Sequence, residues 1–230
     1  MDLPHSIYLI GVLVFGLIWL AMFTARPDLR RHMLFMSLIV GALAFIGGWL
    51  WFTYDWWHPL TLTGTRVGIE DFLLGFTNGG IAIALSEIIF RRRLVNRPGH
   101  RHALGFILLW TLCLGAIAIC FWIFGMTSFW SFVVAAVIIA ISETILRPDL
   151  FIQAIITGLV MMIVILPFYY VMMAIQPDWV DQAYYLTHLT RIMIGGIPLE
   201  EFVFYFFLGF TLAPGYEYWQ NLQARKLRSR

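Results

Sequence analysis

Two adjacent carboxylates, Glu200 and Glu201, stand in the stretch Gly-Gly-Ile-Pro-Leu-Glu-Glu-Phe that begins at Gly195. A similar pair, Glu70 and Asp71, follows Val-Gly-Ile in the first half of the chain. Both pairs lie in runs of otherwise apolar residues. An ionisable side chain within a membrane costs at least about 2.5–3.5 kcal/mol on insertion scales, so it usually has a function. We therefore take these acids as the candidate catalytic residues.

A close pair of carboxylates in a membrane is suited to proton transfer. Burial and a neighbouring like charge favour the protonated form, whereas a helix N-terminus and a nearby Arg66 or Arg191 favour the ionised form. A pair that holds one proton can serve as an acid toward a weak base and as a base toward a carbon acid. The simpler alternative is an acidic helix start that satisfies free amides and the helix dipole. The depth of the pairs in their apolar runs favours the functional interpretation.

Aromatic and amide side chains accompany the carboxylates at helical spacing. Such aromatic residues most often only pack, but their faces can also stabilise a developing cation. Asn78 projects near the same helical face as Glu70 and Asp71, and it could hold a carboxylate or bond to a neighbouring helix. The candidates for substrate binding or for tuning the acids are Arg66, Arg191, Asn78, Phe72, Phe202, Tyr205 and Phe206.

The elements that position these residues are membrane helices. Of the 230 residues, 61% are hydrophobic and 12% are charged, whereas about 25% are charged in soluble proteins. About 20 apolar residues cross the hydrocarbon of a membrane as a helix, and none of the long runs alternates as in an outer-membrane barrel. We predict an all-α, polytopic membrane protein with seven transmembrane helices, in the runs 7–25, 33–53, 67–90, 104–124, 129–146, 151–175 and 192–213.

Basic residues predict how these helices are oriented. With seven spans, all 15 Lys and Arg residues except Arg66 and Arg191 fall on one side of the membrane. The positive-inside rule then places the N-terminus outside and the basic C-terminal tail in the cytoplasm. We expect a multi-pass protein of the cell membrane. The net charge of +2 reflects this topology and does not indicate nucleic-acid binding.

The tetrapeptide Arg-Pro-Asp-Leu occurs twice, at Arg26 and at Arg147. After each copy come a long apolar run, a segment rich in Trp and Tyr, and one of the acidic pairs. The pattern predicts two parallel three-helix repeats, related by an axis along the membrane normal and joined by a linking helix. The expected divisions are a first repeat (1–93), a basic loop with the linking helix (94–127), a second repeat (128–215) and a basic cytoplasmic tail (216–230).

The remaining polar residues have simpler interpretations. Glu87 and Glu143 each precede an arginine by four residues, which predicts helical ion pairs with Arg91 and Arg147. Asp28 and Asp149 are expected to begin the next helix. Cys113 and Cys120 are too far apart for a disulfide and have no His or Cys neighbours for a metal site. We expect neither a metal nor a nucleotide cofactor, because no Gly-x-Gly-x-x-Gly follows a strand.

Together, the duplicated three-helix units and the motif Pro-Leu-Glu-Glu-Phe at Pro198 resemble the membrane-embedded lycopene cyclase domain family. The resemblance covers residues 5 to about 215, and the chain looks like a fused tandem of the two small subunits of a heterodimeric lycopene β-cyclase. The first half departs from the motif: Gly68 stands for Pro, and Asp71 stands for the second Glu.

The resemblance implies an isomerase of carotenoid biosynthesis that takes lycopene from the bilayer and closes its ends to β-ionone rings without a redox change. Glu70, Asp71, Glu200 and Glu201 would supply the acid and the base. It leaves open association with a second copy or with other carotenoid enzymes.

Other functions fit parts of the sequence. A transporter or proton-coupled carrier also combines repeats with intramembrane carboxylates, although here the polar residues concentrate at one depth. A cyclase could act on a longer carotenoid or form ε- or γ-rings. A structural subunit without activity is a further alternative. A retinal-binding receptor is excluded because the only lysine, Lys226, lies in the tail.

Overall fold

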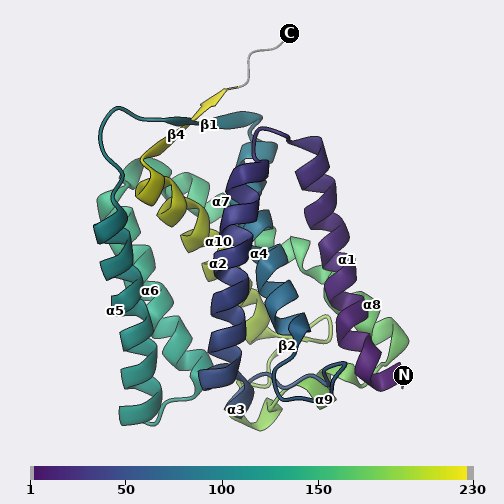
Figure 1. The fold of residues 1–230 in the computed structure, drawn as a ribbon. Helices are drawn as coiled ribbons and strands as arrows, with labels where there is room; N and C mark the ends of the chain where they lie inside the picture. The colour runs from purple at the N-terminus through teal and green to yellow at the C-terminus, as the bar shows by residue number, and fades with distance from the viewer. Residues whose placement is uncertain (1–2, 227–230) are drawn as a thin grey trace.

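The computed structural model describes residues 3–226, and they are largely helical (Figure 1). The main helices are long and nearly parallel, with short elements at their ends. In chain order the elements are α1 (Leu3–Ala25), α2 (Arg30–Gly47), the π-helical turn Gly48–Phe52, α3 (Thr53–Asp55), α4 (Ile69–Ile89), β1 (Arg92–Asn96), α5 (Ala103–Ala118), the π-helical turn Ile119–Ile123, α6 (Ser128–Leu146), the 3-10 turn Pro148–Leu150, α7 (Phe151–Val164), α8 (Leu166–Ile175), α9 (Trp179–Ala183), the 3-10 turn Leu186–His188, β2 (Met193–Ile194), β3 (Ile197–Pro198), α10 (Leu199–Gln220) and β4 (Leu222–Lys226).

Six helical stretches are long and apolar enough to cross a membrane, so the chain is a multi-pass membrane protein. They correspond to the first six predicted runs. Some of the stretches combine an α-helix with a π-helical turn or join two helices, as α7 and α8 do around Pro167. The stretches are Pro4–Ala25, Arg30–Asp55, Ile69–Ile89, Ala103–Ile123, Ser128–Leu146 and Pro148–Ile175.

The seventh predicted run, 192–213, differs from the structure. Its first residues form the two-stranded hairpin β2–β3, and α10 begins only at Leu199. At its other end, α10 continues through Pro214 to Gln220. Three carboxylates make α10 less apolar than the six candidate spans, and its residues are all buried or half-buried among the other helices. The predicted helix therefore exists, but it runs through the protein interior with shifted ends.

α4 and α10 pack together near the middle of the bundle, and each has its own partners. α4 packs against α2 and α1, whereas α10 packs against α7 and α6. In Figure 1, α5 and α6 stand on one side of these helices, and α1 and α8 stand on the other. The acidic pairs lie at the first turns of α4 and α10, so this arrangement brings the two halves of the chain together around them.

Glycine permits close approach in both halves. A Cβ atom on Gly75 of α4 would lie 2.7 Å from the carbonyl oxygen of Val40 in α2. A Cβ atom on Gly209 of α10 would likewise lie 2.7 Å from the carbonyl oxygen of Thr157 in α7. Small residues let membrane helices pack backbone to backbone. Both acid-bearing helices are therefore held tightly against one neighbour.

At the end of the bundle opposite the acidic pairs, the segments after α4 and α10 join. β1 pairs antiparallel with β4, with Arg92 opposite Lys226 and Asn96 opposite Leu222. Of the predicted basic tail (216–230), residues 216–220 belong to α10 and residues 222–226 form β4. Arg228 and Arg230, which contributed to the predicted orientation, lie outside the described residues.

The two Arg-Pro-Asp-Leu copies form matching clips instead of helix caps. Arg26 donates to both carboxylate oxygens of Asp28 at 2.8 Å and to the carbonyl oxygen of Arg92 at 2.5 Å. In the second copy, the guanidinium of the arginine donates to the carboxylate two residues later at 2.8 and 2.9 Å and to the carbonyl oxygen of Leu222 at 3.3 Å. Asp28 and Asp149 thus orient arginines that fasten the chain just beyond α4 and α10. Asp149 lies in the first turn of the following helical stretch, as predicted, whereas Asp28 precedes α2, and neither makes a side-chain capping hydrogen bond among the described residues.

The predicted ion pairs of Glu87 and Glu143 are absent from the described residues. α4 ends before Arg91, whose backbone turns to a φ of 48°, and Arg147 is engaged by its clip. Glu87 accepts a hydrogen bond from Ser86 at 3.2 Å. Glu143 is buried with no hydrogen-bond partner for either carboxylate oxygen among the described residues. Local spacing predicted these pairs, and tertiary packing overrode it.

Gln153 of α7 connects α4 and α10 at this same end. Its amide nitrogen donates to the carboxylate of Glu217 at 2.5 Å and to the hydroxyl of Ser86 at 3.0 Å. It also lies 3.4 Å from the Glu87 carboxylate, and its oxygen accepts from Arg92 at 3.0 Å. We call these five residues the Gln153 junction. It ties the last turns of both acid-bearing helices together inside the protein.

Candidate functional site

The first acid of each pair holds the segment that precedes its helix. Glu70 Oε1 accepts the backbone N–H of Leu62 at 2.6 Å, and Glu200 Oε1 accepts the backbone N–H of Thr190 at 2.6 Å. Both side chains are almost completely buried. A side chain at Gly68 would collide with Glu70 and Thr61, which accounts for glycine where the second half has proline. These two acids therefore fasten loops, and they do so in the same way in both halves.

Asp71, the second acid of the first pair, has three donors around it. Its Oδ1 accepts from the hydroxyl of Tyr8 at 3.0 Å and from the indole of Trp57 at 3.3 Å. Its Oδ2 accepts the backbone N–H of Gly68 at 2.8 Å, which closes the first turn of α4. These donors come from α1, from the segment after α3 and from the helix start, so several elements fix one carboxylate in place.

Glu201, the second acid of the second pair, lies in a tyrosine network. Tyr169 of α8 donates its hydroxyl hydrogen to Glu201. The hydroxyl of Tyr184 lies 2.6 Å from that of Tyr169, and with Tyr169 donating to the acid, Tyr184 donates to Tyr169. All three side chains are buried. The chain of hydroxyls leads from Glu201 toward the segment after α9.

Aromatic rings close the space between the two second acids. The Trp57 ring meets the Tyr184 ring edge-on at 4.9 Å and the Tyr8 ring at 5.3 Å. The backbones of Trp57 and Tyr184 also form an isolated antiparallel bridge. Asp71 and Glu201 are thereby linked through one aromatic cluster that contains residues from both halves. We call Tyr8, Trp57, Tyr169 and Tyr184 the aromatic bridge.

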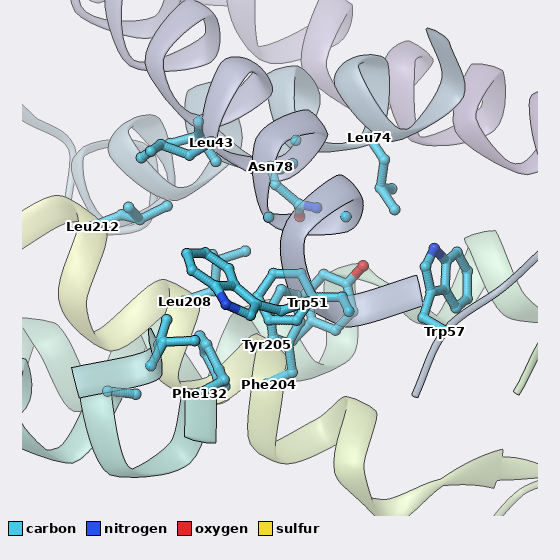
Figure 2. Close-up of a pocket in the computed structure, with 18 of the residues that line it drawn as sticks. Leu43, Trp51, Trp57, Leu74, Asn78, Phe132, Phe204, Tyr205, Leu208 and Leu212 are labelled. Atoms are coloured by element: carbon cyan, nitrogen blue, oxygen red, sulfur yellow. The ribbon is translucent and has the colours of Figure 1, made fainter. Parts of the chain in front are cut away.

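Asp71 and Glu201 both line a cavity of about 180 Å³ between α2, α4, α5, α6 and α10. Its surface is mostly apolar and aromatic, and Figure 2 shows rings gathered around it, including Trp51, Phe132, Phe204 and Tyr205. Glu70 and Glu200 are not among its lining residues. A cavity with apolar walls and one carboxylate from each half can protonate and deprotonate an apolar molecule.

Helical periodicity explains which neighbours reach the cavity. The lining residues of α10 are Glu201, Phe204, Tyr205, Leu208, Thr211 and Leu212, and those of α4 are Asp71, Leu74, Gly75 and Asn78. Both sets follow the spacing of three and four residues that defines one face of a helix. Tyr205 and Asn78, two of the predicted site residues, are thus in the cavity.

Three predicted aromatic residues lie elsewhere. Phe72 packs against Gly41 of α2 and lies 6.1 Å from the Phe76 ring. Phe206 packs against Gly158 of α7, and Phe202 is half-buried and does not line the cavity. Phe72 and Phe202 directly follow the cavity-facing acids, so a step of about 100° along the helix turns them away.

Arg66 and Arg191 are not brought to the carboxylates. Arg66 donates to the hydroxyl of Thr53 at 2.7 Å and to the carbonyl oxygen of Trp49 at 2.9 Å, and it lies over the Tyr54 ring at 4.2 Å. Arg191 is exposed, in a left-handed turn with a φ of 62°. Neither forms an ion pair with an acid within residues 3–226. The expected orientation of the acids by arginine is corrected: hydroxyl, indole and backbone groups orient them.

Several site residues escaped the sequence analysis. Trp57, Tyr169 and Tyr184 belong to the Trp- and Tyr-rich segments that precede the acidic pairs, and Tyr8 to the first apolar run, but many aromatic residues of this chain only pack. Trp51 and Trp56 also line the cavity, and Trp51 belongs to the π-helical turn after α2. Such turns frequently mark functional sites, but they cannot be recognised in a continuous apolar run. The heptad spacing from Glu201 to Leu208 was a usable signal for α10.

Comparison with protein families gives a match that covers most of the chain. The family model described as lycopene cyclase matches residues 5–89 and 125–219. The matched segments contain both acidic pairs and leave out β1 and α5. No curated protein and no solved structure matched the chain. The family implies a carotenoid substrate, which suits an apolar cavity in a membrane protein. Since the match covers most of the chain, the protein belongs to the lycopene cyclase family, a family of enzymes.

Proposed function

We propose that this protein is a lycopene β-cyclase, which closes the linear ends of lycopene to β-ionone rings in carotenoid biosynthesis. The observation that carries the proposal is the cavity that holds one carboxylate from each half, Asp71 and Glu201, within apolar and aromatic walls. A hydrocarbon substrate dissolved in the bilayer reaches such a site without entering water.

The reaction is an isomerisation with balanced proton transfers. One carboxylic acid gives its proton to the terminal double bond of the substrate, which leaves a tertiary cation. The electron pair of the next double bond forms the ring bond, and the positive charge moves to a ring carbon. The other carboxylate removes a ring proton, and the electrons of that C–H bond form the ring double bond. No oxidant or reductant is consumed, so we propose that no nucleotide cofactor or metal is needed.

The acids divide their work within each pair. Asp71 and Glu201 face the cavity and exchange protons with the substrate, whereas Glu70 and Glu200 position them by holding the preceding loops. The aromatic bridge keeps the proton-transfer groups at fixed positions. The rings of Trp56 and Phe204 line the same cavity as Glu201, pack edge to face with their centroids 5.3 Å apart, and favour the cation.

We further propose that the chain is built from two parallel repeats joined by a linking helix. α1, α2 and α4 belong to the first repeat (1–93), α5 to the linking segment (94–127), and α6, α7, α8 and α10 to the second repeat (128–215). The paired clips, loop-holding acids and glycine contacts support this division. In the cell membrane the N-terminus lies outside, and the segment from residue 216 lies on the cytoplasmic side with most of the basic residues.

Expression of the whole chain in cells that accumulate lycopene tests the proposal. Chromatography of the extracted pigments should show mono- and bicyclic carotenoids with β-rings. Unchanged lycopene would contradict the enzyme and, if lycopene moved between membranes, would favour the transporter. Cyclic products with ε- or γ-rings, or a preference for a longer carotenoid, would show a carotenoid cyclase with a different product or substrate. Association with a second copy or with other carotenoid enzymes is compatible with all of these outcomes.

A further inference from the structure

Among the described residues, Asn78 is the one side-chain amide that lines the cavity, on the same face of α4 as Asp71. It does not hold a carboxylate: Asp71 is satisfied by other donors, and Asn78 lies on α4 two turns farther along. The side chain is 3% exposed, and Figure 2 shows it directed into the cavity between Leu43 and Tyr205.

The amide oxygen of Asn78 has no hydrogen-bond partner among the described residues, although it is buried. The Asn78 amide group lies beside the hydroxyl of Tyr205 on α10. Through that contact the amide nitrogen links α4 to α10, but the amide oxygen remains without a hydrogen-bond partner. A buried acceptor without a partner destabilises a fold, so contact between helices alone does not explain an amide at this position.

The place of this oxygen matches the place where charge develops in the reaction. Tyr205 is one helical turn beyond Glu201, and the cavity extends past both residues toward Leu212. A substrate end protonated at the depth of the acids has its ring carbons slightly deeper in the cavity, at the level of Tyr205 and Asn78. Dipoles fixed in advance toward developing charge are among the strongest catalytic devices.

An amide is better suited to this task than another carboxylate would be. Its carbonyl oxygen carries partial negative charge and attracts a cation, but it is too weak a base to remove the ring proton. The cation therefore persists until the catalytic carboxylate takes the proton. The aromatic faces nearby attract the same cation, and the oxygen adds a directed contact to that diffuse attraction.

We propose that Asn78 is a third catalytic residue, whose amide oxygen stabilises the ring cation formed between proton addition and proton removal. This inference rests on the proposed cyclase function. The oxygen gains a partner only when the cation is present, so it acts on the transition state more than on substrate binding.

Asn78→Leu tests the inference, because leucine has nearly the same shape and lacks the oxygen. The readout is the initial rate of lycopene cyclisation by the full chain in liposomes, at several substrate concentrations. We expect kcat to fall on the order of 100-fold, as when one charge-stabilising group is removed from an active site, with KM nearly unchanged. Thr77→Val is the matched control: Thr77 is the adjacent buried polar residue, bonds only to backbone carbonyls of Leu73 and Leu74, and lies outside the cavity.

The outcomes separate this inference from the function on which it rests. If the wild-type protein produces no cyclic carotenoid, the proposed function fails. If the wild type is active and Asn78→Leu has the same kcat, Asn78 has no catalytic role. A rise in KM with unchanged kcat would also overturn the proposal, since it indicates substrate binding alone. Should Asn78→Leu fail to fold, Asn78→Ala removes the amide oxygen without adding bulk, and a wild-type kcat in that variant would equally overturn it.

Discussion

At the scale of single residues, the two acids of each motif differ although they are neighbours in the sequence. One points back to a loop amide, and the other points into the cavity. Sequence patterns identified all four acids but could not separate these roles, because the partners Leu62, Thr190, Tyr8 and Tyr169 are fixed only by tertiary structure. The same limitation hid the aromatic bridge and gave Arg66 and Arg191 a role that the structure does not support.

Conservative amide substitutions separate the roles of the acids. Asp71→Asn and Glu201→Gln remove the ability to transfer a proton, so we expect cyclisation to fall at least about 100-fold, in line with the contribution of general acid–base groups. Glu70→Gln and Glu200→Gln keep a carbonyl oxygen that can accept the same loop N–H, so these variants should retain most of the activity. Pigment ratios in lycopene-producing cells, normalised to protein amount, provide the measurement. Full activity in Asp71→Asn together with loss in Glu70→Gln would reverse the assignment.

At the scale of elements, apolar runs predicted most of the helices, and their ends were harder to predict. The hairpin β2–β3 lies in an apolar stretch, so the predicted span includes it. β4 forms only because β1 lies beside it. The repeated Arg-Pro-Asp-Leu was recognised as significant, but its function as a clip depends on carbonyl groups that follow α4 and α10. A sequence repeat shows which residues of the two halves are equivalent, and their contacts show what those residues do.

The first clip predicts a stability that depends on pH. The hydrogen-bonded Arg26 guanidinium holds the pKa of Asp28 below its ordinary value, which is about 3.9 for aspartate. The contribution of the pair is therefore present above that ordinary value and is lost as the pH falls through the lower, folded-state pKa. Because Asp28 is partly exposed, we expect Asp28→Asn to cost about 1 kcal/mol or less at neutral pH.

Thermal unfolding of the purified protein in detergent tests this clip. At pH 7, Asp28→Asn should melt below the wild type, and the difference should shrink as the pH is lowered past the pKa of Asp28. Asp181→Asn, which changes an aspartate of α9 that belongs to no ion pair of the described residues, should melt like the wild type. A difference between Asp28→Asn and wild type that grows on acidification would contradict the pairing.

At the scale of the whole molecule, the two acid-bearing helices meet at both ends, with different chemistry at each. Near the acidic pairs, the aromatic bridge joins the halves around the cavity. At the far end, the Gln153 junction joins Glu87 and Glu217, which occupy equivalent positions in α4 and α10. Gln153 is the central member of that junction because its amide nitrogen donates to both carboxylates. Gln153 is not among the residues that line the cavity.

Gln153→Leu should therefore lower stability without altering the proton chemistry of the cavity. It removes the shared donor and leaves buried acceptor oxygens of Glu87 and Glu217 without that partner, which should cost on the order of 3 kcal/mol because an unsatisfied buried polar group loses its hydration without compensation. Melting temperature in detergent should fall clearly, whereas kcat of the protein that remains folded at lower temperature should stay close to that of the wild type.

Gln182→Leu provides the comparison for this substitution, because Gln182 is exposed in α9 and bonds only to Asp178 within its own segment. That variant should melt within a degree or so of the wild type, since surface changes away from special features have small effects. If Gln153→Leu proved as stable as Gln182→Leu, the junction would not hold the halves together. If instead kcat of the folded Gln153→Leu protein collapsed, the two ends of α4 and α10 would be coupled, and the cavity would depend on a junction that it does not touch.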